Sequence, residues 1–369
     1  MSTGPSEETR AGVSAYSLTM PSQEPAPPTV EDVAAAAGVS TATVSRVLNG
    51  LGGVREPLRR KVLSAVERLG YVPNAGARAM MLRRSGTVGA IFPTVDNAIF
   101  AKAIDALQRR LAESGLQLLL ATSDYDPQAE ARQALALLTS GVDALLLCGC
   151  GQPPELLQRL AQRGLPVVHV MTWPAPPGRV AVGFDNRRAM GQAVRYLLDL
   201  GHKRIAMLAG ITQGNDRAAA RVAGVRDALH AAGLELAPSR LVERRYGLAA
   251  AREGLRTLLQ ARPAPTAVVC GNDVLAFGAL LEAQALGLDV PADLSIVGFD
   301  DLELASHLQP ALTTVQVPAE AMWRCAADLV LSLLRGEPPP AAVELQVSLV
   351  VRGSTGPAPR RAVRAARAG

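Results

Sequence analysis

Several residue types that usually carry reactive chemistry are scarce in this sequence. Aromatic residues make up 3% of its 369 residues, and it holds four cysteines and four histidines. Cys148 and Cys150 have one residue between them, which differs from the two-residue spacing of redox and zinc motifs. The histidines also lack the spacing of metal ligands. We therefore predict buried thiols, no metal site and no cofactor.

Long apolar runs are also missing. The sequence has no stretch of about eighteen apolar residues, and it does not begin with basic residues followed by an apolar block. These absences argue against a membrane span and against a secretory signal. We therefore expect a cytoplasmic protein with no membrane partner.

Catalytic motifs are absent as well. We find no nucleophile paired with a base, no glycine loop suited to phosphates and no metal cluster at the required spacing. The closest approach to paired carboxylates is Asp124-Tyr125-Asp126, which precedes Pro127 in a predicted loop leading into a helix. We predict that the protein is not an enzyme.

Charge is distributed unevenly along the chain. Residues 28–86 contain nine Lys or Arg and four Asp or Glu, a net charge of +5. Residues 87–356 contain 24 basic and 26 acidic residues, a net charge of −2. A short basic segment joined to a nearly neutral body favours a polyanion as partner.

The basic segment carries the signals of a helix-turn-helix. Residues 29–32 match a capping box, and Gly38 is suited to end the first helix. Ser40 is suited to cap a second helix over residues 41–48, and a third helix is expected over residues 57–69. Two short helices joined by so tight a turn form a helix-turn-helix.

From Thr87 onward, strand patterns alternate with helix patterns, which is typical of parallel sheets covered by helices. The order recurs, because residues 106–116 resemble residues 224–234 and residues 143–149 resemble residues 266–271. We predict an α/β body of two similar lobes. The predicted divisions are a disordered leader (1–27), a helix-turn-helix domain (28–73), a hinge (74–86), a two-lobed effector-binding domain (87–356) and a basic disordered tail (357–369).

The segment 29–50, TVEDVAAAAGVSTATVSRVLNG, resembles the DNA-binding segment of the lactose and galactose repressor family. The likeness continues through VREPLRRKVLSAVERLGYVPNA, GHKRIA at 201–206, Arg221 with Gly224, Asn272-Asp273 and GFDD at 298–301. It covers roughly residues 29–353.

This resemblance implies a body shaped like a periplasmic binding protein, with two Rossmann-like lobes around a ligand cleft. It also implies a homodimer that binds a pseudo-palindromic operator in double-stranded DNA. General rules agree: parallel sheets place ligands at the carboxyl ends of their strands, and a two-fold dimer matches half-sites about 10 base pairs or a multiple apart.

In the second predicted helix, the resemblance assigns base contacts to Thr41, Ala42 and Arg46, although Arg46 could instead be a solvated surface arginine. The further DNA contacts that it assigns are phosphate contacts at Thr29, Ser40, Thr43, Ser45 and Asn49, and hinge contacts at Asn74, Arg78 and Met80. Met80 corresponds to a leucine that enters the minor groove in the family. The alternative is that Met80 packs the hinge against the body.

In the body, Arg221, Asn272 and Asp300 correspond to the family's effector-contacting groups, and all three types can hold hydroxyls or carboxylates. We predict that Arg221→Ala removes the effector response and leaves folding nearly intact. The other assigned residues are Phe100 and Tyr246, as aromatic walls, and Asp185 and Asp273, as strand-end aspartates that could instead cap helices.

One position departs from the family pattern. Many sugar-binding members have an aspartate after the strand predicted at 167–170, where this sequence has Met171. The effector class therefore stays open among sugars, sugar acids and related metabolites.

Together these features predict a nucleoid-associated transcriptional regulator, in the first place a repressor, whose operator affinity a small-molecule effector controls. Such an effector must bind two lobe arrangements with different affinities. In this family effectors act as inducers or as corepressors, and both remain open. The alternative is an exported periplasmic-type binding protein, against which the missing signal and the basic segment argue.

Overall fold

The computed structural model describes residues 27–50, 52–73, 84–338 and 342–359. The chain divides into two compact units between Met81 and Leu82. Within the described ranges, no helix is long and apolar enough to cross a bilayer.

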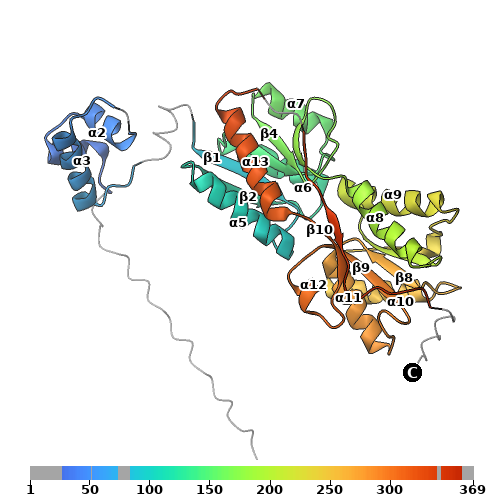
Figure 1. The fold of residues 1–369 in the computed structure, drawn as a ribbon. Coiled ribbons are helices and arrows are strands. Elements are labelled where there is room, and N and C mark those ends of the chain that lie inside the picture. The colour runs from blue at the N-terminus through green and yellow to red at the C-terminus, as the bar shows by residue number, and fades with distance from the viewer. Residues whose placement is uncertain (1–26, 51, 74–83, 339–341, 360–369) are drawn as a thin grey trace, which may run out of the picture. The chain divides into compact units, whose positions relative to one another are not determined.

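The first unit consists of α1 (Val30–Ala37), α2 (Thr41–Leu48) and α3 (Glu56–Leu69), as Figure 1 shows. The predicted capping box is confirmed, because Thr29 and Asp32 exchange hydrogen bonds at the start of α1. Gly38 ends α1 with a φ of 65°, a left-handed conformation that favours glycine. Val33, Val44 and Val62 are fully buried between the helices. The three predicted helices and their core are thus confirmed.

The first lobe of the second unit surrounds a sheet with strand order β11-β5-β4-β3-β1-β2. Its strands are β1 (Thr87–Phe92), β2 (Gln117–Thr122), β3 (Ala144–Cys148), β4 (Val167–Val170), β5 (Val180–Gly183) and β11 (Val343–Glu344). Its helices are α5 (Ala98–Ala112), α6 (Pro127–Thr139), α7 (Pro154–Gln162) and α13 (Ala319–Leu334).

The second lobe surrounds a sheet with strand order β12-β10-β9-β8-β6-β7. Its strands are β6 (Ile205–Gly210), β7 (Leu241–Arg244), β8 (Ala267–Cys270), β9 (Ser295–Asp300), β10 (Thr313–Gln316) and β12 (Ser348–Val350). Its helices are α8 (Asn186–Asp199), α9 (Asp216–Ala231), α10 (Leu248–Leu259), α11 (Asp273–Ala285) and α12 (Leu304–His307), with a 3₁₀ turn, η1 (Pro238–Arg240).

The first five strands of the two sheets have equivalent topology, whereas the sixth is parallel to its neighbour in the first lobe (β11) and antiparallel in the second (β12). Matching β1 with β6, β2 with β7, β3 with β8, β4 with β9 and β5 with β10 gives the same strand order in both lobes. This confirms the internal similarity predicted from the sequence. The chain crosses between lobes after β5, after β10 and after β11, so α13 and β11 return to the first lobe.

Helix α13 completes the first lobe, where it packs against α5 (Figure 1). Its Trp323 is 1% exposed and stacks on Phe92 of β1, with ring centroids 4.5 Å apart. Phe92 in turn contacts Phe100 edge to face at 5.8 Å. A residue late in the sequence is therefore part of the core behind the first strand.

Hydrogen bonds attach residues outside the predicted range 87–356 to the second unit. The backbone N–H groups of Ser85 and Gly86 donate to the carboxylate of Asp143 at 2.9 and 2.7 Å. Ala358 donates to the carbonyl of Leu200 at 2.9 Å, beyond the predicted end at 356. The remaining predicted leader, hinge and tail fall on residues 1–26, 74–83 and 360–369, outside the described residues.

Candidate functional site

Helix α2 has one buried and one exposed face. Val44 and Val47 pack into the core of the first unit, whereas Thr41, Ala42 and Arg46 are exposed. The three residues with predicted base contacts therefore share the open face of the second helix of a helix-turn-helix. In such motifs this is the helix that enters the major groove.

Several residues with predicted phosphate contacts are held in place by local hydrogen bonds. Ser40 Oγ lies 3.0 Å from Thr43 Oγ1 and accepts from the Thr43 backbone N–H at 3.3 Å. Asn49 Nδ2 donates to the backbone carbonyl of Ser45 at 2.9 Å. These bonds, like the cap made by Thr29, fix polar groups at the helix ends. The predicted contacts Asn74, Arg78 and Met80 lie outside the described residues.

A small chamber lies between the lobes of the second unit, at the carboxyl ends of strands from both sheets. It has a volume of about 30 Å³. It brings together five of the predicted effector residues, namely Phe100, Arg221, Tyr246, Asn272 and Asp300, and its other lining residues are Asn97, Ile99, Tyr125, Met171, Asn215 and Arg217. The first lobe contributes mostly apolar groups and the second lobe mostly charged and amide groups.

Arg221 of α9 is buried at the centre of this chamber, with 5% exposure. Its Nε donates to Asn186 Oδ1 at 2.8 Å and its Nη1 to the carbonyl of Gly271 at 2.5 Å. Its guanidinium carbon lies 3.7 Å from the ring centroid of Phe299. Burial lowers the pKa of Arg221, and the nearby carboxylate of Asp300 opposes this shift. The protein thus holds the guanidinium in a fixed orientation.

Asp300 faces Arg221 from the end of β9, with Oδ1 4.0 Å from Nη2. Its φ of 116° is unusual for a residue with a side chain, so the backbone is strained at this point. Burial raises the pKa of Asp300 to about 8, although Arg221 favours the ionised form. Strain and a perturbed carboxyl at one position are typical of a ligand-binding site.

Stability should therefore depend on pH through Asp300. The folded protein keeps this proton up to a pH of about 8, whereas the unfolded chain loses it near 3.8, so the free energy of unfolding falls as the pH rises between these values. For one such group, the free energy of unfolding falls by up to about 1.4 kcal/mol for each pH unit in this range. We expect Asp300→Asn to make the decline of Tm shallower, measured by differential scanning fluorimetry, while Asp273, whose pKa burial raises to about 7, keeps part of it.

The control for this measurement is Asp199→Asn, which removes an exposed carboxyl of α8 outside the chamber. Its Tm should decline with rising pH as steeply as that of the wild type. Parallel curves for wild type and Asp300→Asn would show that Asp300 does not hold the proton.

Two predicted effector residues do not line the chamber. Asp185 caps α8 by accepting from the backbone N–H of Arg188 at 2.9 Å. Asp273 is fully buried, and it accepts from the backbone N–H of Leu302 at 2.7 Å and from Thr314 Oγ1 at 2.6 Å. Asp185 thus caps a helix, the alternative that its position left open, whereas Asp273 caps no helix and instead binds a loop and a strand.

Arg217 and Tyr125 line the chamber without having been predicted from the sequence. Arg217 comes four residues before Arg221 on α9, so helical spacing places both on one face and could have indicated it. Tyr125 follows β2 in the loop that we singled out for its carboxylates. No spacing rule pointed to this tyrosine.

The mouth of the cleft is a wider space of about 620 Å³ between the same lobes. Across it, Asp124 Oδ2 accepts from Arg245 Nη1 at 3.1 Å. The rings of Tyr125 and Tyr246 meet with centroids 5.3 Å apart. Each pair joins a loop of the first lobe to a loop of the second, so these contacts depend on the closed arrangement of the lobes.

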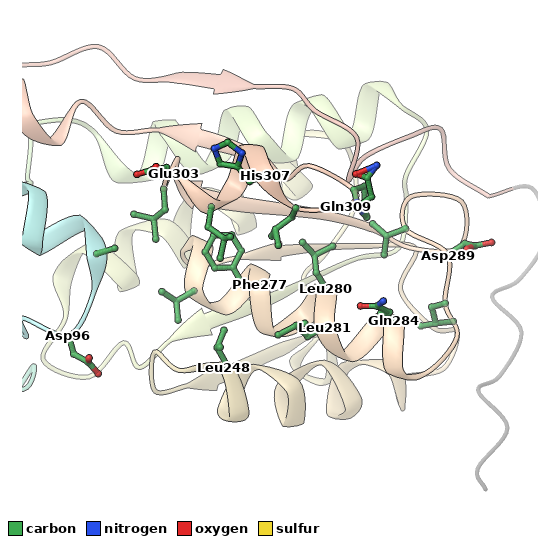
Figure 2. Close-up of a pocket in the computed structure, with 18 of the residues that line it drawn as sticks. Asp96, Leu248, Phe277, Leu280, Leu281, Gln284, Asp289, Glu303, His307 and Gln309 are labelled. Carbon is green, nitrogen blue, oxygen red and sulfur yellow. The ribbon is translucent and has the colours of Figure 1, made fainter.

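An apolar groove of about 1000 Å³ lies beside α11 (Figure 2). Leu248, Leu281 and Leu304 are 47%, 43% and 49% exposed along it, and Phe277 also lines it. Figure 2 shows Asp96 and Asp289 at opposite ends of the groove, and Glu303 and Gln309 above its apolar side chains. A large exposed apolar patch with a polar rim is typical of an interface.

Two family profiles match the chain. The profile described as bacterial regulatory proteins, lacI family, matches residues 29–74. The profile described as a periplasmic binding protein-like domain matches residues 194–355. The first match covers the helix-turn-helix, and the second lies in the two-lobed unit.

Curated proteins and solved structures resemble nearly the whole chain. The HTH-type transcriptional regulator DegA of Bacillus subtilis (strain 168) is 34% identical over 336 residues, which cover 89% of this chain and 98% of that protein. Catabolite control protein A of Priestia megaterium is 34% identical over 309 residues, which cover 84% and 93%. The lac repressor dimer bound to operator and the anti-inducer ONPF is 27% identical, with a TM-score of 0.80 over 89% of this chain and 99% of that one.

These findings confirm the predicted fold and resemblance. The relatives are regulators of transcription, so the exported binding protein is not supported. The chain belongs to the lacI family of bacterial regulatory proteins, and it is a DNA-binding transcriptional regulator built from a helix-turn-helix and a periplasmic-binding-protein-like effector domain.

Proposed function

We propose that the protein is a repressor that binds a pseudo-palindromic operator as a homodimer and responds to a small-molecule effector bound between its lobes. The observation that carries this proposal is the exposed face of α2, where Thr41, Ala42 and Arg46 are free of the core. A solved relative, the lac repressor, forms a dimer on its operator.

The groove beside α11 is the surface that we propose for the homodimer. In a two-fold interface the same patch of each subunit meets its copy, so one self-complementary apolar surface is sufficient. Pairing would remove Leu248, Leu281 and Leu304 from water, while Asp96 and Glu303 would lie in the polar rim.

The chamber is the place that we propose for the effector, a sugar, sugar acid or related metabolite. Its guanidinium, amide and carboxyl groups can bind hydroxyl or carboxylate groups of a small ligand. Control follows if the effector binds one arrangement of the lobes more tightly than the other. The Asp124–Arg245 and Tyr125–Tyr246 contacts would break when the lobes part.

The proposal includes no catalytic step, because the relatives act as regulators and the chamber groups serve binding. We place the protein in the cytoplasm at the nucleoid, since its proposed partner is chromosomal DNA.

DNA binding can be tested by fluorescence anisotropy with duplexes from the region upstream of its own gene. We expect one fragment to compete better than random DNA, with affinity that falls steeply with salt. Arg46→Ala should weaken specific binding by about 1 to 3 kcal/mol per half-site and leave binding to random DNA nearly unchanged, because arginine can bind guanine in a bidentate manner.

Arg68→Ala is the matched control, since Arg68 is an exposed arginine of the same unit near the end of α3. It should keep the preference for the specific fragment. If no fragment competes better than random DNA in the presence or absence of candidate effectors, the repressor proposal is wrong.

A further inference from the structure

A second, smaller cavity adjoins the effector chamber on the side of the first lobe. Its volume is about 10 Å³, close to the space of one water molecule. Tyr125 and Arg217 line both spaces, so the small cavity, which we call the side pocket, is next to the chamber. Its polar groups from the first lobe include Ser123, Glu130 and Gln152.

Gln152 leaves one hydrogen-bonding group of this pocket unsatisfied. The side chain is 4% exposed, and its Nε2 donates to Glu130 Oε1 at 3.0 Å. Its Oε1 has no hydrogen-bond partner among the described residues. A buried acceptor without a donor is unfavourable, so this oxygen requires a donor from a molecule that enters the pocket.

Arg217 supplies the opposite chemistry from the second lobe. It is 8% exposed and pairs with Asp216, with Nη1 3.1 Å from Oδ1. The guanidinium lies so close to Gly149 that a Cβ there would fall 2.2 Å from Nη1. Glycine at this position thus lets the arginine reach the loop that carries Gln152.

These groups favour a neutral ligand group that both donates and accepts. Arg217 and Asp216 offset each other's charge at the pocket, and an anion would meet two further acceptors, Gln152 Oε1 and the Glu130 carboxyl group. Burial raises the pKa of Glu130, which shows that further negative charge is unfavourable there. A hydroxyl can accept from Arg217 and donate to Gln152, and it has the size of the water it would replace.

We propose that this side pocket binds one hydroxyl group of the effector and thereby selects among polyhydroxylated ligands. The inference rests on the proposed function, because it assigns a specificity-determining position to the same cleft. The chamber itself holds the space of only a few waters, so entry of the rest of the ligand requires the lobes to part.

The experiment uses the full chain and a defined set of pentoses, hexoses, hexitols and aldonic acids. The compound that raises Tm most is then titrated by calorimetry, together with each of its monodeoxy analogues. Gln152→Met should lower affinity for the parent compound about tenfold. One deoxy analogue should bind wild type and Gln152→Met equally, because its missing hydroxyl is the one that Gln152 binds.

Without ligand, Gln152→Met should change Tm little, because it removes the unsatisfied acceptor but also the amide that donates to Glu130 Oε1. Glu130→Gln is the second variant, since a new amide at 130 can donate to Gln152 Oε1 and compete with the ligand. It should raise Tm and lower affinity for the parent compound. If both variants had a lower Tm than the wild type and still bound the parent compound with wild-type affinity, the proposal would be contradicted.

The remaining outcomes distinguish a failure of the side-pocket proposal from a failure of the proposed function. Equal affinity of wild type and Gln152→Met for the parent and all analogues would overturn the side pocket, leaving it a water site. No shift with any compound would overturn the hydroxyl assignment, while the anisotropy experiment still tests DNA binding. Wild-type affinity in Arg221→Met would instead place the effector outside the chamber.

Discussion

Arg221→Ala is expected to abolish effector binding and also to destabilise the second unit. The variant leaves Asp300 as an unpaired buried carboxyl and removes the donors to Asn186 and Gly271. Leaving a buried acceptor without its donor typically costs about 1 to 3 kcal/mol, and the variant does this at both Asn186 and Gly271. Guanidinium denaturation should show this loss, and calorimetry with any compound that stabilises the wild type should show no binding.

The matched control is Arg187→Ala on the neighbouring helix α8, where an exposed arginine pairs with Asp227 across the surface. That variant should retain both stability and ligand binding. If Arg221→Ala is as stable as Arg187→Ala and still binds ligand, the chamber at Arg221 is not the effector site.

This expectation revises the one drawn from the sequence, in which Arg221→Ala left folding nearly intact. Sequence position indicated correctly that the side chain faces the cleft. It could not show that the cleft is closed around the guanidinium, because burial at 5% exposure depends on residues from both lobes. Asn186 illustrates this, since its amide donates to Met171 of the first lobe and accepts from Arg221 of the second.

Leu281→Asp is expected to convert the protein into a monomer with greatly weakened operator affinity. In the proposed dimer the new carboxylate would be buried in an apolar interface, where an unpaired charge costs several kcal/mol. Two linked reading helices bind about 10² to 10⁴ times more tightly than one. Analytical ultracentrifugation should show the change in mass, and anisotropy should show the weaker operator binding.

Val351→Asp serves as the comparison, because Val351 is 54% exposed in the same lobe and does not line the groove. It should remain a dimer with wild-type operator affinity. A Leu281→Asp protein that sediments as a dimer would exclude the groove as the interface.

Local sequence signals predicted the elements of this fold well. The capping box at Thr29, the glycine after α1 and the alternation of strands and helices depend on neighbouring residues, and each is confirmed. The return of the chain to the first lobe at α13 was not predicted. Internal repeats indicate that the two lobes are similar, but they do not show where the chain crosses from one lobe to the other. The roles of the strand-end aspartates were equally ambiguous in the sequence. In the structure Asp185 caps a helix, and Asp273 accepts hydrogen bonds from a loop and a strand.

The side pocket and the groove lay beyond sequence reasoning for a related reason. Gln152 and Arg217 are 65 positions apart and belong to different lobes, so only the folded chain brings them together. The leucines of the groove occupy α10, α11 and α12, each with an ordinary helical pattern. Only the folded surface shows that these leucines are exposed side by side.

The interleaved path of the chain has a consequence for synthesis in the cell. The first lobe has all but one of its strands by Gly183, yet it receives α13 and β11 only when residue 344 has been made. A ribosome adds roughly 5 to 20 residues per second, so this lobe waits on the order of ten seconds without Trp323 over Phe92. During that interval the second lobe emerges beside an unfinished core. A nascent chain in this state exposes apolar surface that chaperones recognise, and its final maturation is governed by its C-terminal third.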